Sequence, residues 1–302
     1  MTKDIVNLNN VTGTQPTTAV AFAGSTITID VPVGPTYHAI WINGGPGASK
    51  LMSDLIGEIR IKINGKVQRV RTADRINIMN QLHGARYAAV NATANSATAA
   101  SNVFSLPIFF AEPWRKNLNA QEGLAWGTGD VSTFQIEIDL KAATFTTLTA
   151  ITAQAEIDDG PARPLGVITK WVEYNVPTAS GWNDFTTLPR TSGAYSQLTI
   201  IDANLVEFEF KTSNKVRRQA TAARNRNYLR NRDLFPNESA SGDVIARTGY
   251  HDIVFDLDDI PGNALPMVDP ATGKPWRDVN LRISTTTAGT VPVLIEVQGF
   301  AE

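Results

Sequence analysis

The sequence predicts an all-β protein built as a pair of antiparallel sandwiches or jelly rolls, each with a short helix after a hairpin. Three observations support this prediction. The chain has 302 residues, more than one hydrophobic core usually spans, so two domains are expected. Apolar residues recur at every second position in many short segments separated by Gly- and Pro-containing turns. A strand–turn–strand–helix unit in the first half returns in the second.

The first copy of this unit runs from Leu55 to Leu82. Its alternating apolar residues end at Asn64-Gly65, a pair that strongly favours the type I′ turn of a hairpin. After the return strand, Thr72 is suited to be the N-cap of a helix with apolar residues on one face. The second copy starts at Leu205 and has the same order, but its helix is rich in arginine. The two copies are therefore expected to face different neighbours.

The other alternating or apolar segments are predicted to be strands. They are residues 25–31, 37–42, 103–110, 133–140, 148–157, 168–176, 197–202, 251–258, 279–285 and 291–300. Residues 1–24 lack this periodicity and are expected to form an N-terminal arm, and residues 83–102 a long exposed excursion. The turn-forming segment 158–164 is the expected link between domains. The predicted division is an arm (1–24), a first domain (25–160) and a second domain (161–302).

Composition excludes several functional classes. Hydrophobic residues make up 42% of the chain and charged residues 19%, which is typical of a folded globular protein. The net charge of -2 argues against a dedicated nucleic-acid binder, so no sequence-specific nucleic acid partner is expected. The absence of cysteine excludes disulfides, thiolate zinc sites and cysteine nucleophiles. No signal-peptide pattern or membrane-spanning apolar run is present, so we expect neither a cleaved export signal nor insertion in a membrane.

Candidate ion-binding residues are few. Carboxylates cluster at Asp158 and Asp159 and again at Asp256 and Asp258, and oxygen-rich loops suit Ca²⁺. The alternative, favoured because no complete ligand set is evident, is that these are solvated strand ends and turns. His38, His83 and His251 are far apart in the sequence and lack the spacing of a zinc site. We expect no catalytic residue and no cofactor, and Ca²⁺ is the one ion for which candidate ligands are present.

The most unusual charge distribution lies in the second copy of the repeated unit. Between residues 215 and 232 the chain has seven basic residues and no acidic one: Lys215, Arg217, Arg218, Arg224, Arg226, Arg230 and Arg232. One interpretation is an inward face that meets anionic lipid headgroups or the genome. The other is an exposed helix that pairs with acidic residues of a neighbouring subunit. The sequence favours neither, because it does not orient the helix.

Four segments, in this order along the chain, carry a resemblance to a known family: VPVGPTYHAI at 31–40, EIRIKINGKVQRVRT at 58–72, STFQIEIDL at 132–140 and LRISTTTAGTVPVLIEVQGF at 281–300. In these segments the chain resembles the double jelly-roll major capsid proteins of tailless bacteriophages with an internal membrane, of the corticovirus type. The resemblance implies two tandem jelly rolls in a pseudo-hexameric homotrimer. Such trimers tile an icosahedral shell around the membrane.

The expected function is therefore that of a structural major capsid protein without a catalytic step. The resemblance implies as partners other copies of the chain in the trimer, neighbouring capsomers, and the penton and minor capsid or membrane proteins of the virion. It also implies peripheral contact with the lipid membrane, and a place in the virion capsid after synthesis in the cytoplasm of a bacterial host. The rival hypothesis is a two-domain β-sandwich that binds or hydrolyses carbohydrate, because jelly rolls serve both purposes. A glycosidase would bring together two carboxylates about 5 to 9.5 Å apart.

Overall fold

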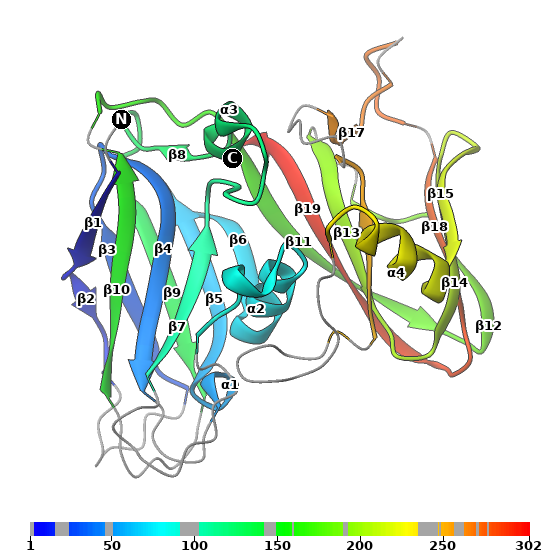
Figure 1. The fold of residues 1–302 in the computed structure, drawn as a ribbon, viewed down its shortest axis with the longest axis horizontal. Coiled ribbons are helices and arrows are strands. Elements are labelled where there is room, and N and C mark those ends of the chain that lie inside the picture. The colour runs from blue at the N-terminus through cyan, green and yellow to red at the C-terminus, as the bar shows by residue number, and fades with distance from the viewer. Residues whose placement is uncertain are drawn as a thin grey trace. The chain divides into compact units, whose positions relative to one another are not determined.

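The computed structural model describes residues 3–15, 24–45, 51–90, 103–141, 149–158, 160–189, 193–234, 247, 249–256, 263–269, 272–276 and 278–302. The chain forms two compact units. The first unit comprises Met1–Ile168, Pro236–Ala246 and Ala301–Glu302. The second comprises Thr169–Phe235 and Arg247–Phe300. Each unit has its own pair of sheets (Figure 1).

The first unit has the strand order of a jelly roll. One sheet has the order β1 (Lys3–Leu8), β10 (Thr149–Asp158), β4 (Thr36–Gly45) and β7 (Phe104–Phe109), with the short β8 (Trp126–Gly127) also paired to β4. The other has the order β2 (Val11–Thr12), β3 (Thr26–Val31), β9 (Phe134–Leu140), β5 (Ile56–Ile63) and β6 (Lys66–Thr72). When the eight long strands are numbered along the chain, the sheets read 1-8-3-6 and 2-7-4-5.

The second unit repeats this order. Its first sheet has the order β11 (Val167–Thr178), β19 (Gly289–Phe300), β13 (Ala194–Ile201) and β16 (Tyr250–Val254), with β17 (Leu265–Pro266) also paired to β13. Its other sheet has the order β12 (Gly181–Phe185), β18 (Val279–Thr285), β14 (Leu205–Thr212) and β15 (Lys215–Thr221). The eight long strands again read 1-8-3-6 and 2-7-4-5. The prediction of two tandem jelly rolls is confirmed.

Alternation along the strands separates core from surface, because successive side chains of a strand point to opposite faces. In β9, Phe134, Ile136 and Ile138 are buried, while Glu137 and Asp139 between and beside them are partly exposed. Strand β18 shows the same alternation in the second unit, where every second residue from Val279 to Thr285 is buried. Each unit therefore buries one face of each of these sheets in its own core.

Each hairpin of the repeated unit has a tight turn between its two strands, and a helix follows its second strand. Asn64 and Gly65 have φ of 51° and 77°, and Ser213 and Asn214 have φ of 46° and 62°, as the turns that best match strand twist require. Helices α2 (Ala73–Gln81) and α4 (Ala222–Arg230) follow these hairpins. The shorter helices are α1 (Met52–Leu55), η1 (Ala85–Tyr87) and α3 (Leu118–Glu122). Among the described residues, no helix combines the length and apolarity needed to cross a membrane.

Three segments differ from what the sequence suggested. Residues 1–24, expected as an arm, include β1, which pairs with β10 along its whole length. Residues 83–102, expected to be exposed, include the buried Tyr87, Ala88 and Ala89, while residues 91–102 lie outside the described part. The segment expected as a link lies against the first unit: the Gly129 N–H donates to the carbonyl oxygen of Arg163 at 2.8 Å.

Candidate interaction surface

The seven basic residues predicted from the sequence lie on one strand and the helix that follows it. Strand β15 carries Lys215, Arg217 and Arg218, helix α4 carries Arg224, Arg226 and Arg230, and Arg232 follows the end of the helix. We refer to these seven residues as the basic surface. Strand β15 is at the edge of its sheet, so the structure brings the whole predicted set to one border of the second unit.

Helix α4 is held in place by a buried side chain, Asn225, which is 2% exposed. Its Nδ2 donates a hydrogen bond to the backbone carbonyl of Asp252 in β16 at 2.6 Å. Its Oδ1 accepts a hydrogen bond from the Arg218 guanidinium at 3.2 Å. Because buried amides need partners for both their donor and their acceptor atoms, this arrangement satisfies both. Asn225 therefore joins β15, α4 and β16.

The carboxylate of Asp252 lies at the centre of a buried polar cluster. Asp252 is fully buried and pairs with Arg247, which is 1% exposed. Thr199 Oγ1 donates to the carboxylate at 2.6 Å, and Gln197 Nε2 donates at 3.2 Å. A buried ion pair is stable only when further hydrogen bonds offset the loss of hydration. The two donors from β13 supply these bonds, and they hold in place the part of β16 to which α4 is attached.

Aromatic rings fix the positions of several guanidinium groups. The Arg218 guanidinium carbon lies 3.8 Å from the centroid of the Tyr228 ring, and that of Arg232 lies 5.7 Å from it. Arg217 lies 5.3 Å from the Trp276 ring. Stacking of this kind orders the planar guanidinium and leaves its edge for hydrogen bonds to carboxylate or phosphate. The sequence did not identify Tyr228 and Trp276 as positioning residues.

The outer part of the basic surface is open to solvent. Lys215, Arg224, Arg230 and Arg232 are exposed. Arg218, Arg224 and Tyr228 also line a cleft of about 450 Å³. The first turn of α4, where Thr221 Oγ1 accepts from the Arg224 backbone N–H at 3.3 Å, carries the positive end of the helix dipole. This arrangement suits contact with an anionic surface or group.

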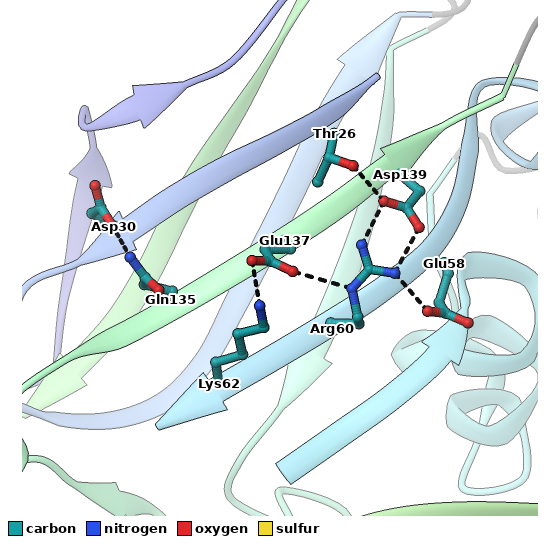
Figure 2. A network of polar contacts seen from close by, with 8 residues as sticks. All are labelled: Thr26, Asp30, Glu58, Arg60, Lys62, Gln135, Glu137 and Asp139. Atoms are coloured by element: carbon teal, nitrogen blue, oxygen red, sulfur yellow. Dashed lines mark hydrogen bonds and ion pairs between the residues drawn. The ribbon is translucent and has the colours of Figure 1, made fainter. Parts of the chain in front are cut away.

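In the first unit, the outer face of the corresponding sheet carries charges that pair with one another (Figure 2). Arg60 on β5 donates to both carboxylate oxygens of Asp139 at 2.6 and 2.7 Å and to Glu137 at 3.1 Å. Glu58 accepts from Arg60 at 2.7 Å, and Lys62 donates to Glu137 at 2.5 Å. Strands β5 and β9 thus neutralise their charges locally.

These contacts shift the pKa values of the groups involved. The hydrogen bond to Asp139 raises the pKa of Arg60. The pKa of Asp139 is lowered by the Arg60 hydrogen bond, and that of Glu137 by the Lys62 hydrogen bond first and then by Arg60. The acid catalyst of a glycoside hydrolase needs a raised pKa. The pKa values of Asp139 and Glu137 are lowered instead, so neither carboxylate suits the role of that acid catalyst.

The two helices of the repeated unit differ in burial. In α2 seven residues are buried: Ala73, Ile76, Asn77, Ile78, Met79, Asn80 and Gln81. In α4 only Asn225 and Leu229 are buried. The first helix is thus covered within its own unit, whereas most of the second remains available for contact with other molecules. This difference follows the contrast in sequence between the two helices.

The candidate calcium ligands do not form a site in the described part of the chain. Asp158, 4% exposed, ends β10 in the first unit and lies 3.7 Å from Arg163. Asp256, 7% exposed, follows β16 in the second unit. Asp159 and Asp258 lie outside the described residues. No group of three or more His, Cys, Asp or Glu side chains in the described ranges is placed to hold a metal ion, and calcium binding stays a prediction.

Each histidine has its own environment. His38 is 3% exposed, and burial lowers its pKa. His83 stacks on Trp114 with ring centroids 3.9 Å apart. His251, whose pKa is also lowered by burial, lies with its Nε2 2.9 Å from the carbonyl oxygen of Asp202. His83 and His251 therefore each have a contact within the chain.

Comparison with known proteins relates both the sequence and the fold to viral coat proteins. Residues 12–158 match the family described as the viral coat protein P2 N-terminal domain. The fold is similar to that of the major capsid protein P2 from Bacteriophage PM2, with a TM-score of 0.77 and 17% identity, covering 100% of this chain and 98% of that one. No curated protein matches the sequence significantly.

Two more distant capsid structures share the fold. The STIV major capsid protein has a TM-score of 0.65 at 11% identity, with 99% of this chain and 97% of that one covered. A chain of the PBCV-1 virus capsid has a TM-score of 0.60 at 10% identity, with 100% and 98% covered. Residues 12–158 are thus similar in sequence to the viral coat protein P2 N-terminal domain family, and the chain has the double jelly-roll fold of these capsid proteins.

Proposed function

We propose that this chain is a major capsid protein, that it forms homotrimers with a pseudo-hexagonal outline, and that these trimers tile an icosahedral shell around an internal membrane. The observation that carries the proposal is the repeated strand order, 1-8-3-6 and 2-7-4-5 in each unit. Three chains with two similar barrels each supply six similar building blocks around a threefold axis. A hexagonal outline is the natural result, and hexagons can cover a surface side by side.

Assembly in this proposal proceeds through burial of complementary surfaces between copies and needs no catalytic step. Obligate interfaces commonly bury about 2,000 Å² or more in total. Rigid partners lose less entropy on association, and the ion-pair network around Arg60 and the buried cluster around Asp252 both favour rigidity. We propose no enzymatic activity for the chain.

The basic surface is the proposed contact with neighbours other than the trimer mates. Its exposed members, Lys215, Arg224, Arg230 and Arg232, suit acidic side chains of an adjacent capsomer or anionic lipid headgroups at the membrane. Penton and minor capsid or membrane proteins of the virion are further proposed partners. The net charge of -2 argues against sequence-specific binding of nucleic acid.

Native mass spectrometry of the purified full-length protein tests the trimer. We expect a trimer that persists on dilution, and electron microscopy of assembled shells should show three-fold capsomers with a six-sided outline. A persistent monomer that binds oligosaccharides would overturn the proposal in favour of the carbohydrate-active alternative. If trimers form but do not assemble into shells without lipid, the membrane is required for tiling and not for formation of the trimer.

A further inference from the structure

The first unit contains a pocket of about 250 Å³ on the outer face of the sheet that includes β4 and β7. Ala39 on β4 and Phe109 on β7 line it, because the alternate residues Ile40 and Ile108 point into the core and are fully buried. Tyr87, from the segment after α2, lines another side. The pocket is mostly apolar and is formed by residues of one unit.

A β-bulge places His38 in the wall of this pocket. Ala39 pairs with Glu156 and Tyr37 pairs with Ile157, so His38 is an extra residue in β4. Bulges of this kind redirect a side chain and often occur beside functional sites. His38 is 3% exposed, and neither of its ring nitrogens has a hydrogen-bond partner among the described residues. Buried polar groups normally have a partner, so His38 requires an explanation.

The side of the pocket formed by Tyr87 is rigid. The Tyr87 ring meets Phe109 and Trp114 edge-on, with centroids 5.7 and 5.6 Å away. Its hydroxyl donates to the carbonyl oxygen of Pro113 at 3.0 Å. A pocket wall that is already ordered loses little entropy when a ligand binds.

Three charged residues line the pocket: Lys3, Glu156 and Arg86, whose solvent-exposed guanidinium lies 4.7 Å from the centroid of the Tyr87 ring. Lys3 at the rim pairs with Glu156 at 3.1 Å, so these two charges offset each other. Burial lowers the pKa of His38, which leaves the imidazole neutral near pH 7 with one donor and one acceptor nitrogen. A neutral imidazole in a mostly apolar pocket can pair with a hydroxyl or N–H group of a ligand and so fix its orientation.

The volume limits the size of the ligand. An apolar cavity of about 150 Å³ holds benzene, so a pocket of about 250 Å³ has room for one ring with a substituent or for two fused rings. We propose that this pocket binds a small uncharged aromatic molecule with one hydroxyl or N–H group, and that the His38 imidazole is its hydrogen-bonding partner. This inference is independent of the basic surface.

Phenol and toluene test the proposal, because they have the same shape and differ in a hydroxyl against a methyl group. Both dissociation constants are measured by NMR titration of the full-length assembled protein and of His38→Leu. We expect both probes to bind saturably to the wild type and to His38→Leu. The ratio of the phenol affinity to the toluene affinity should be about five- to tenfold lower in the variant. An unchanged ratio would overturn the role of His38, and lack of saturable binding to the wild type would overturn the site.

A second pair of variants checks the location. Ala39→Leu fills the pocket and should abolish binding of both probes, whereas Asn43→Leu, on the same strand but outside the lining, should leave binding unchanged. Binding that survives Ala39→Leu would place the probes elsewhere and overturn the proposal. If His38→Leu does not assemble, the test uses the NMR chemical shifts of the imidazole nitrogens in the wild type. Phenol should move those of His38 and leave those of His251 in place, and the reverse result would contradict the inference.

Discussion

The side-chain amide of Asn225 donates to the backbone carbonyl of Asp252 at 2.6 Å and thereby fixes a largely exposed helix to the sheet beside it. The same amide accepts from Arg218 at 3.2 Å. One residue therefore sets the position of α4 and of a guanidinium group on the basic surface. Since Leu229 is the only other buried residue of α4, the helix depends on few contacts.

Asn225→Ala is expected to destabilise the protein by about 1–3 kcal/mol, because it leaves a buried carbonyl and the Arg218 guanidinium without their partner. Asn227→Ala changes an exposed residue of the same helix and should have little effect. Urea unfolding at fixed protein concentration measures both. Equal stability of the two variants would show that Asn225 does not anchor α4.

Charge reversal at Arg224 and Arg226 is expected to impair assembly or lipid association. Each basic group near an anionic membrane contributes about 1 kcal/mol, so loss of two weakens binding to anionic vesicles about thirtyfold or more. The matched control is Lys66→Glu with Lys274→Glu, which changes the net charge equally at two exposed sites. Vesicle co-sedimentation and shell yield are measured for both. Lost vesicle binding with normal shells indicates a lipid contact, defective shells alone indicate a subunit contact, and normal results in both assays contradict either role.

Arg60→Met is expected to cost about 1–3 kcal/mol, because the carboxylates of Asp139, Glu137 and Glu58 then lose a shared cation and repel one another. Lys66→Met, at the turn end of the same hairpin and exposed, should change stability by less than about 0.5 kcal/mol. Chemical denaturation compares the two. A neutral Arg60→Met variant would show that the network in Figure 2 contributes no stability.

Acidification is expected to reduce stability in two ranges of pH. The pKa values of His38 and His251 are lowered in the folded state, so the unfolded chain binds more protons once the pH falls below about 6.5. The stability that these two groups contribute above this pH is lost as the pH falls toward their pKa values in the folded protein. The lowered pKa values of Glu137 and Asp139 add a second loss below about pH 4. Denaturation of the wild type and His251→Gln between pH 8 and pH 3, at about one-unit steps, checks this sign. The variant should lose less stability in the upper range, and a wild type that gains stability there would contradict the prediction.

Gly127→Ala is expected to destabilise the first unit by about 1–3 kcal/mol, because a Cβ there would lie 2.6 Å from the carbonyl oxygens of both Arg163 and Pro164. Gly166→Ala is the matched control, since nothing lies within 4 Å of its Cβ position. Thermal unfolding at fixed concentration should show a lower transition temperature for the first variant only. Similar transitions for both would mean that the segment around Arg163 moves aside freely.

The strands with a clear two-residue period were predictable from the sequence. The segments 133–140 and 279–285 are β9 and β18, because their sheets bury one face and leave the other toward solvent. Strands β1 and β12 escaped prediction. Leu8 is the only buried residue of β1, and β12 has none, so these edge strands carry no apolar period. Hydrogen bonds to their neighbours define them, and those are not visible in sequence.

The basic surface was predictable because its members are close together in the chain. Its supports were not, since they come from a later segment: Asp252 reaches Asn225, and Arg247 pairs with Asp252, only in the folded protein. The position of His38 was equally hidden, because the bulge depends on the register between β4 and β10. Arg69 is also buried and donates to the carbonyl of Phe109 at 2.6 Å. Its burial was not predictable, because it lies in a segment with many polar residues.

The exposed edge of strand β15 also bears on aggregation. It lies at the edge of its sheet and so presents backbone groups without a strand partner in that sheet. An open strand edge is a template on which a second chain can pair and aggregate, and positive side chains on the edge oppose such pairing. Lys215, Arg217 and Arg218 provide this protection. The charges on β15 therefore oppose uncontrolled pairing of one chain with another along this edge.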